Sequence, residues 1–194
     1  MTKKEIREEL LSRREKLTPA EREAKDLSIR DRLLADPAWG DAEIVLTYLS
    51  CRGETDTRML IRDAAEAGKA VYAPRITDRQ AGEMEFFRLD AGFGTRPGPY
   101  GIEEPAGEER LPDDCAGSRT LILLPGVGFS ENRDRIGYGG GFYDRYLARR
   151  TDLMNRIALC YDCQVTEVVS RVPFAATDIR PDRIITETRT IGTW

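Results

Sequence analysis

The chain carries, at residues 120–145, the run TLILLPGVGFSENRDRIGYGGGFYDR. Its first five residues, Thr120–Leu124, form a continuous apolar stretch that predicts a strand buried on both faces. Glycines gather at 137–141, and the residues at 142–150 have the spacing of an amphipathic helix. A further strand is predicted at 156–159. This βαβ unit indicates a parallel sheet covered by helices.

Outside this unit, alternating patterns extend the same architecture. Strands are predicted at 43–49, 69–73, 84–89 and 183–186, and a helix at 57–67. The Gly/Pro-rich stretch at 91–114 is expected to be a loop or lid. We therefore predict a three-layer α/β/α fold with a mostly parallel sheet, as a single domain over residues 1–194 whose α/β core spans 43–194.

The first 36 residues are predicted to form a helical hairpin. Thr2 with Glu5, and Thr18 with Glu21, have the spacing of capping boxes, and a proline follows Thr18 at the first helical position. Ile6, Leu10, Leu11 and Leu17 supply the apolar stripe of the first helix, and Ala24, Leu27 and Leu34 that of the second. The hairpin is expected to pack against the α/β core.

The composition excludes several classes of protein. The sequence contains no histidine, which removes Ser-His-Asp and Cys-His catalysis and histidine metal sites. A net charge of -4 argues against a dedicated nucleic-acid binder. No apolar run approaches the ~20 residues of a membrane span, and the start of the chain is charged. We expect a cytoplasmic monomer that binds small molecules, with no nucleic-acid or membrane partner.

Cys160 and Cys163 form a CxxC pair. A redox or zinc site is one interpretation, but no second pair stands at zinc-ribbon spacing. The pair follows a predicted strand, in which residues three apart point to opposite faces. Small buried apolar residues are the favoured interpretation.

The glycine cluster is interpreted as a phosphate site. Consecutive glycines leave N–H groups uncovered, and the helix N-terminus adds partial positive charge. The segment lacks the Lys-Ser/Thr ending of a P-loop, and Phe142 stands where a dinucleotide fingerprint requires Gly or Ala. A purely structural turn is the alternative. Arg135 and Asp144, on either side of the glycines, favour phosphate binding.

Two other segments have both a functional and a structural interpretation. Lys3, Arg7 and Arg14 share a face of the first helix and form either a clamp on a polyphosphate or a solvated face paired with nearby glutamates. Asp178 and Asp182 are either turn residues or ligands for Mg²⁺. In parallel sheets, ligands bind beyond the carboxyl ends of the strands. The segments at 50–54, 74–75 and 125–144 are expected to converge there.

The residues resemble the 5-formyltetrahydrofolate cyclo-ligase family, whose members are also called 5,10-methenyltetrahydrofolate synthetases. The resemblance rests on the glycine signature at 135–147, preceded by LPGVGF at 124–129, and covers nearly the whole chain. It includes KKEIR at 3–7, YLS at 48–50 followed by Glu54, GIEEP at 101–105, and Gln164. Many relatives carry histidine just before the aspartate matched by Asp178, where this chain has Thr177.

The resemblance implies ATP- and Mg²⁺-dependent cyclisation of 5-formyltetrahydrofolate to 5,10-methenyltetrahydrofolate, through a phosphorylated formyl intermediate, with release of ADP and phosphate. It implies Arg135 and Tyr143 as catalytic residues and Asp144 and Asp182 as Mg²⁺ ligands. The implied ATP contacts are Lys3, Lys4, Arg7, Arg135, Ile136, Gly137, Tyr138, Gly139, Gly140, Gly141, Phe142 and Tyr143. The implied folate contacts are Leu49, Glu54, Tyr100, Tyr138, Gly139, Gly140, Gly141 and Phe142.

Two other functions are compatible with the same motifs. Another ATP-dependent activating enzyme on this scaffold would share the glycine loop and act on a different acid or amide. A non-catalytic nucleotide-binding protein would share it too, although the metal carboxylates would then have no purpose. The residues that face the second substrate distinguish these alternatives.

Overall fold

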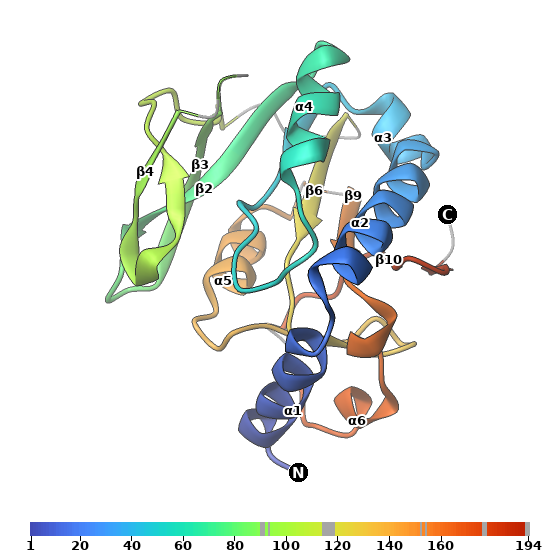
Figure 1. Cartoon of the computed structure of the whole chain (residues 1–194). Helices are drawn as coiled ribbons and strands as arrows, with labels where there is room; N and C mark the ends of the chain where they lie inside the picture. Colours follow the sequence, from blue (N-terminus) through green and yellow to red (C-terminus); the bar gives the residue numbers. More distant parts are fainter. Residues whose placement is uncertain are drawn as a thin grey trace.

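The computed structural model describes residues 1–89, 92, 94–113, 119–151, 153, 155–175 and 178–192 (Figure 1). Its central sheet has the strand order β11-β10-β9-β6-β1-β2-β3. The five inner strands are parallel, and the two edge strands, β3 and β11, are antiparallel to their neighbours. The seven strands are β1 (Ile44–Leu46), β2 (Ala70–Asp78), β3 (Glu83–Arg88), β6 (Thr120–Leu124), β9 (Asn155–Leu159), β10 (Arg183–Ile185) and β11 (Thr190–Ile191).

Helices cover both faces of this sheet, which confirms the predicted three-layer α/β/α fold. Successive residues of β6 point to opposite faces: Leu121 and Leu123 belong to one apolar cluster, and Ile122 and Leu124 to another. The first cluster packs against α2 (Pro19–Leu34), α3 (Pro37–Asp41) and α4 (Arg58–Glu66), and the second against α5 (Phe142–Arg149). The predicted βαβ unit is therefore β6-α5-β9.

The N-terminal helices differ from the predicted hairpin. Both capping boxes are present, at Thr2 and Thr18. However, α1 (Lys3–Glu15) packs mainly on the short segments η2 (Asp162–Gln164) and β7 (Gly128–Phe129), whereas α2 packs on α3 and β10. The two helices follow one another along the molecule in Figure 1. Each helix packs on a different apolar surface of the core. The two helices therefore do not pack against each other as a hairpin.

The buried face of α2 also differs from the prediction. Ala24 and Leu27 are exposed, and the buried residues are Asp26, Ile29 and Leu33. Asp26 accepts a hydrogen bond from the hydroxyl of Tyr161 at 2.8 Å. Burial raises the pKa of this carboxyl group to about 6. Because the acidic Asp26 lies on the buried face of α2, the pattern of apolar residues predicted the wrong face.

Strand β2 is longer than predicted, because it continues past Pro74 to Asp78. Proline donates no backbone hydrogen bond and is tolerated in a strand only where a neighbour is missing. Here β1 pairs only with residues 70–72 of β2, and beyond that point β3 alone continues the pairing. The β2–β3 hairpin thus projects beyond the sheet.

The Gly/Pro-rich stretch predicted as a loop or lid contains a small hairpin within its described residues, 92 and 94–113. Strand β4 (Thr95–Pro97) pairs with β5 (Glu103–Pro105), and the one-turn helix η1 (Pro99–Gly101) lies between them. The hairpin contacts β2 through β5. It therefore lies beside the projecting part of β2 (Figure 1).

The remaining elements are β8 (Arg135–Ile136), which pairs with β7, and the short helix α6 (Glu167–Ser170). Cys160 is buried at the end of β9, and Cys163 is half-buried in η2. Burial raises the pKa of both thiols, which suits structural and unreactive cysteines. In the described residues, no helix combines the length and apolar character that crossing a bilayer requires.

Candidate active site

The candidate site lies where the strand connections change direction. From β1 the chain crosses to β2 on one side, and from β6 it crosses to β9 on the other. A crevice beyond the carboxyl ends of two such strands is the usual ligand site of an open α/β sheet. A cavity of about 540 Å³ occupies this position. Its lining includes Tyr48 and Leu49 after β1, and Pro125 after β6.

One end of the cavity is formed by the glycine loop, residues 137–141, which connects β8 to α5. Gly139 and Gly141 have positive φ angles of 102° and 66°, which non-glycine residues rarely adopt. Gly141 is the N-cap residue of α5, and no side-chain hydrogen bond caps the helix within the described part of the chain. The first N–H groups of α5 are thus left for another acceptor, as in anion sites at helix N-termini.

Helix α1 brings two cations to the glycine loop. Arg7 Nε donates to the carbonyl oxygen of Gly137 at 2.7 Å, and Lys3 Nζ pairs with Asp178 at 3.0 Å. Both side chains line the cavity. Lys4 does not: its side chain is 83% exposed and lies 3.9 Å from Glu8 on the same helix. Of the α1 cations that the resemblance implies as ATP contacts, the structure brings Lys3 and Arg7 into the site and leaves Lys4 outside it.

Arg135 and Asp144 meet on the floor of the same end. Arg135 Nη2 donates to Asp144 Oδ1 at 2.5 Å, and the guanidinium also donates to the carbonyl oxygen of Pro125 at 3.3 Å. The N–H of Ile179 donates to the same aspartate oxygen at 3.1 Å. Asp144 is therefore held in place by a buried cation and a backbone amide, and it faces the cavity.

The two expected metal ligands are not brought together. Asp182 does not line the cavity, and its carboxylate takes hydrogen bonds from the Arg156 guanidinium at 2.7 and 3.0 Å and from the Arg156 N–H at 2.8 Å. Asp178 lines the cavity instead. Among the described residues there is no cluster of three or more Asp, Glu or Cys side chains that could enclose a metal ion. Thr177 lies outside the described residues.

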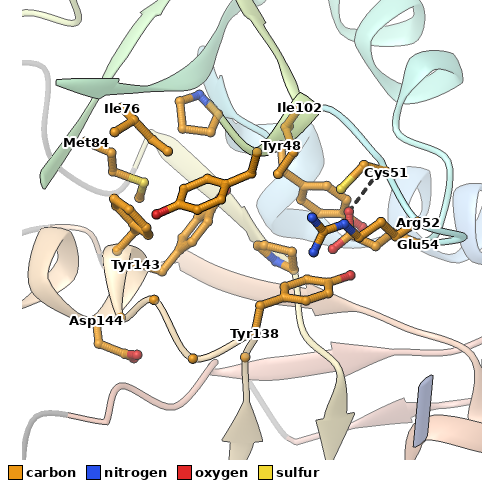
Figure 2. Close-up of a pocket in the computed structure, with 18 of the residues that line it drawn as sticks. Tyr48, Cys51, Arg52, Glu54, Ile76, Met84, Ile102, Tyr138, Tyr143 and Asp144 are labelled. Carbon is orange, nitrogen blue, oxygen red and sulfur yellow. Dashed lines mark hydrogen bonds between the residues drawn. The ribbon is translucent and has the colours of Figure 1, made fainter. Parts of the chain in front are cut away.

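The other end of the cavity is built around Glu54. Its carboxylate accepts a hydrogen bond from the N–H of Cys51 at 3.0 Å, drawn as a dashed line in Figure 2. Burial raises the pKa of this carboxyl group, and that hydrogen bond, Tyr138 and Arg14 oppose the rise. Burial also raises the pKa of the Cys51 thiol to about 11. We call this the Glu54 end, in contrast to the glycine-loop end.

Tyr100 lines the cavity from the β4–β5 hairpin. Its ring meets that of Phe142, the first residue of α5, edge to face with centroids 6.4 Å apart. Its hydroxyl accepts a hydrogen bond from Arg79 Nε at 3.2 Å, and the residue has a positive φ angle of 61°. The expected aromatic side chain thus lines the cavity, and the hairpin closes one side of it.

Tyr143 provides a polar atom without a partner. Its hydroxyl is buried in the cavity wall, and no hydrogen bond reaches it from the described residues. Burial strongly raises the pKa of this phenol, so the group is neutral and able to donate a proton in a hydrogen bond. Such a buried orphan group is costly unless a ligand or water satisfies it.

Some lining residues were missed by the sequence patterns. Ile76 and Met84 are paired in the β2–β3 hairpin and face the cavity (Figure 2). The prediction ended β2 at residue 73 and so gave these residues no place at the site. Conversely, Arg75 was expected at the rim, but it is buried against Phe87 and donates to the carbonyl oxygen of Pro105.

The two ends differ in chemical character. At the glycine-loop end, uncapped amides, Lys3, Arg7 and Arg135 suit an anion with several phosphate groups, and the Asp144 carboxylate suits a hard cation. At the Glu54 end, a buried carboxylate among apolar and aromatic side chains suits a flat ring system with N–H donors. One cavity therefore offers adjacent sites for two small molecules.

Comparisons with known proteins agree with this description. The 5-formyltetrahydrofolate cyclo-ligase family matches residues 1–187. The chain belongs to this family. The 5-formyltetrahydrofolate cyclo-ligase of Escherichia coli K12 is 31% identical over 179 residues, covering 91% of this chain and 96% of that protein. The mouse enzyme of the same name is 28% identical over 193 residues, covering 95% and 93%.

Solved structures show the same fold. The NMR structure of the Aquifex aeolicus 5,10-methenyltetrahydrofolate synthetase is similar with a TM-score of 0.81 and 28% identity, covering 98% of this chain and 92% of that one. The Mycoplasma pneumoniae 5,10-methenyltetrahydrofolate synthetase gives a TM-score of 0.75 at 20% identity, covering 96% and 99%. The chain thus shares its arrangement of layers with both of these proteins.

Proposed function

We propose that this chain converts 5-formyltetrahydrofolate into 5,10-methenyltetrahydrofolate with ATP as co-substrate and Mg²⁺ as cofactor. One observation carries the proposal: a single cavity joins an anion-binding glycine loop to a buried carboxylate, in a chain of the cyclo-ligase family. The related proteins from Escherichia coli and mouse bear the name of this activity. The products besides the methenyl compound are ADP and phosphate.

ATP is assigned to the glycine-loop end. The uncapped N-terminus of α5 and the glycine amides would receive the phosphates, and Lys3 and Arg7 would face them from α1. The backbone of residues 136–143 would lie along the bound nucleotide. Lys4, which points to solvent, supplies long-range positive charge and no direct contact in this arrangement.

Mg²⁺ fits beside Asp144. This cation is typically held by one or two carboxylates together with substrate phosphates and water, so one well-placed aspartate suffices. Asp144 would hold the ion, which would offset charge on the phosphate oxygens when bound. Asp182 would have to leave Arg156 to serve as a direct ligand, and we therefore assign the metal to Asp144 alone.

The folate is assigned to the Glu54 end. The Glu54 carboxylate would accept hydrogen bonds from N–H donors of the pterin ring, and Leu49 would pack against its face. Tyr100 and Phe142 would pack on the substrate where it passes toward the glycine loop. A buried carboxylate discriminates against analogues that lack the matching donors, because it would be left without a partner.

The chemistry is a phosphoryl transfer followed by ring closure. The formyl oxygen attacks the γ-phosphorus of ATP, the bond to the bridging oxygen breaks, and ADP leaves. The second folate nitrogen then attacks the activated formyl carbon, loses its proton, and expels phosphate. Neither step requires histidine, which agrees with the composition of the chain.

Arg135 and Tyr143 act on the transferring phosphoryl group in this proposal. Phosphoryl transfer is catalysed mainly by positioning and by neutralisation of charge. The Arg135 guanidinium is buried and directed by Asp144, so its charge is preorganised and poorly screened. The partnerless hydroxyl of Tyr143 would donate to an oxygen of the same group.

A spectrophotometric assay tests the proposal. The purified protein is mixed with 5-formyltetrahydrofolate, and the methenyl product and ADP are followed together with and without ATP and Mg²⁺. We expect product and ADP in equal amounts, and none of either when the folate, ATP or Mg²⁺ is left out. ADP release that another acid stimulates and the folate does not would favour a different activating enzyme.

A further inference from the structure

Arg14 of α1 is a charged side chain in an unusual place. It is only 1% exposed, and its Nε and Nη1 atoms have no hydrogen-bond partner among the described residues. Its Nη2 atom donates to the carbonyl oxygen of Arg52 and to the hydroxyl of Tyr138, each at 2.8 Å. Burying a cation with incomplete hydrogen bonding is unfavourable, which indicates a compensating role.

Arg14 does not line the cavity, so it is not a clamp on the phosphates. It lies behind the cavity wall at the Glu54 end. Its guanidinium is 5.8 Å from the centre of the Tyr138 ring, and its Nη2 atom holds the backbone of the loop that carries Cys51 and Glu54 through the carbonyl oxygen of Arg52. A chain of contacts thus runs from the buried cation to the Tyr138 hydroxyl and to the loop that holds the Glu54 carboxylate.

We propose that Arg14 is a positioning residue that, through its hydrogen bonds to the carbonyl oxygen of Arg52 and the hydroxyl of Tyr138, keeps the Glu54 carboxylate directed into the cavity and able to accept hydrogen bonds. A carboxylate accepts hydrogen bonds at both oxygens, whereas the protonated acid has to donate one. The proposal rests on the proposed function, in which Glu54 accepts hydrogen bonds from a folate ring. Arg14 would touch neither substrate, but it would contribute to recognition of the folate.

The other groups around Glu54 do not replace this cation. Tyr48 faces it from the end of β1, Tyr138 from the glycine loop, Tyr143 from α5, and Cys51 from its own loop; all four are neutral acids whose pKa is raised by burial. Arg52, also on that loop, has a side chain that reaches solvent, so water screens its charge. Among the described residues named here, Arg14 is the cation that is buried.

The experiment is a ¹³C NMR titration of the Glu54 carboxyl group, assigned by comparison with Glu54→Gln. In Arg14→Met we expect the pKa of Glu54 to rise by about 1, because a nearby opposite charge favours the ionised form. Tyr138→Phe, which removes the connecting hydroxyl from a residue that is 37% exposed, is expected to raise the pKa of Glu54 as well and to keep the fold.

Arg13→Met is the matched control. Arg13 is the next residue of α1, half exposed and paired with Glu9, so its loss removes one positive charge from the same helix without touching the chain of contacts. The pKa of Glu54 should stay at its wild-type value. A Glu54 pKa that is unchanged in folded Arg14→Met, or in Tyr138→Phe where Arg14→Met does not fold, overturns the proposal. An equal rise in Arg13→Met overturns it too.

The same variants also test whether the Glu54 pKa controls folate binding. Binding of 5-formyltetrahydrofolate, measured by calorimetry against pH, should lose affinity at a higher pH in Arg14→Met than in wild type. At pH values below the Glu54 pKa of both proteins, the variant should bind folate about tenfold more weakly, and ATP affinity should be unchanged. A wild-type protein that binds no folate at any pH would contradict the proposed function. The ligand-free NMR titration still decides the role of Arg14.

Discussion

The glycine-loop end and the Glu54 end of the cavity differ in how their residues come together. At the first, a continuous motif supplies most of the groups: Arg135, the glycines and Asp144 lie within ten positions of one another. At the second, Glu54 depends on a loop after β1, on Arg14 from α1 and on Tyr138 from the glycine loop. The first end is encoded locally, whereas the second is produced by the tertiary fold.

This difference predicts different responses to mutation. A change at the glycine-loop end should act on the chemical step or on the nucleotide. A change at the Glu54 end should act on folate recognition and leave the nucleotide alone. The variants below test that separation, beginning with the largest expected effect.

Arg135→Ala should have the largest effect on turnover. By analogy with other arginines that stabilise a transferring phosphoryl group, we expect kcat to fall about a thousandfold, or about 4 kcal/mol. Folate affinity should remain unchanged. Arg135→Lys keeps the positive charge but lacks the planar guanidinium that donates two parallel hydrogen bonds. Its kcat should therefore lie between those of Arg135→Ala and wild type. Wild-type turnover in a folded Arg135→Ala protein would contradict this role.

Glu54→Gln should weaken folate binding by about thirtyfold, since a hydrogen bond to a charged group contributes about 2 kcal/mol. Because burial raises the pKa of Glu54, its ionised form is lost as pH falls through that raised value, and wild-type folate affinity should fall with it. The glutamine variant should show a flat profile. Calorimetry with folate and with ATP separates the two ends, and equal losses for both ligands would break the comparison.

Asp144→Asn should raise the Mg²⁺ concentration that half-saturates activity, by about tenfold. Asp182→Asn is the matched control, because it removes an aspartate that is bound to Arg156 outside the cavity. Its Mg²⁺ titration should be that of wild type, with a loss of about 0.5 kcal/mol in the free energy of unfolding. The reverse pattern would restore Asp182 as the metal ligand.

Gly139→Ala should give the smallest effect, a loss of about tenfold or less in ATP affinity. Gly139 has a φ angle of 102°, and a side chain there costs about 1–2 kcal/mol of backbone strain. A Cβ atom itself would meet only the flexible end of Arg7 at 3.5 Å. Gly137→Ala, in the same loop, should lose less ATP affinity than Gly139→Ala, because Gly137 has no positive φ angle and has room for a methyl group.

The same contrast explains what the sequence could predict. The β6-α5-β9 unit and the position of the glycine loop follow from local patterns, because apolar period and glycine content act over a few residues. Lys4 and Asp182 could not be separated from Lys3 and Asp178 in this way. Adjacent helix positions point to different sides, and only the fold shows that Arg156 takes the carboxylate of Asp182.

The burial of Arg14 and the length of the β2–β3 hairpin were missed for related reasons. In the sequence, Arg14 shares a face of α1 with Lys3 and Arg7. Its burial therefore depends on which elements of the fold pack over it. The extension of β2 past Pro74 depends on β1 ending early, which one strand's pattern does not reveal. The burial of Arg14 and the length of β2 both depend on the elements packed beside them, and not on the local sequence.

The contact between Lys3 and Asp178 joins residues 175 positions apart, and that between Arg7 and Gly137 joins residues 130 apart. Such contacts close very long loops, and we expect them to form late in folding because the entropy of closure opposes them until the intervening elements have packed. The sheet can thus assemble before α1 docks. A nascent chain would acquire its core first and its nucleotide site last, so that binding competence marks the completion of folding.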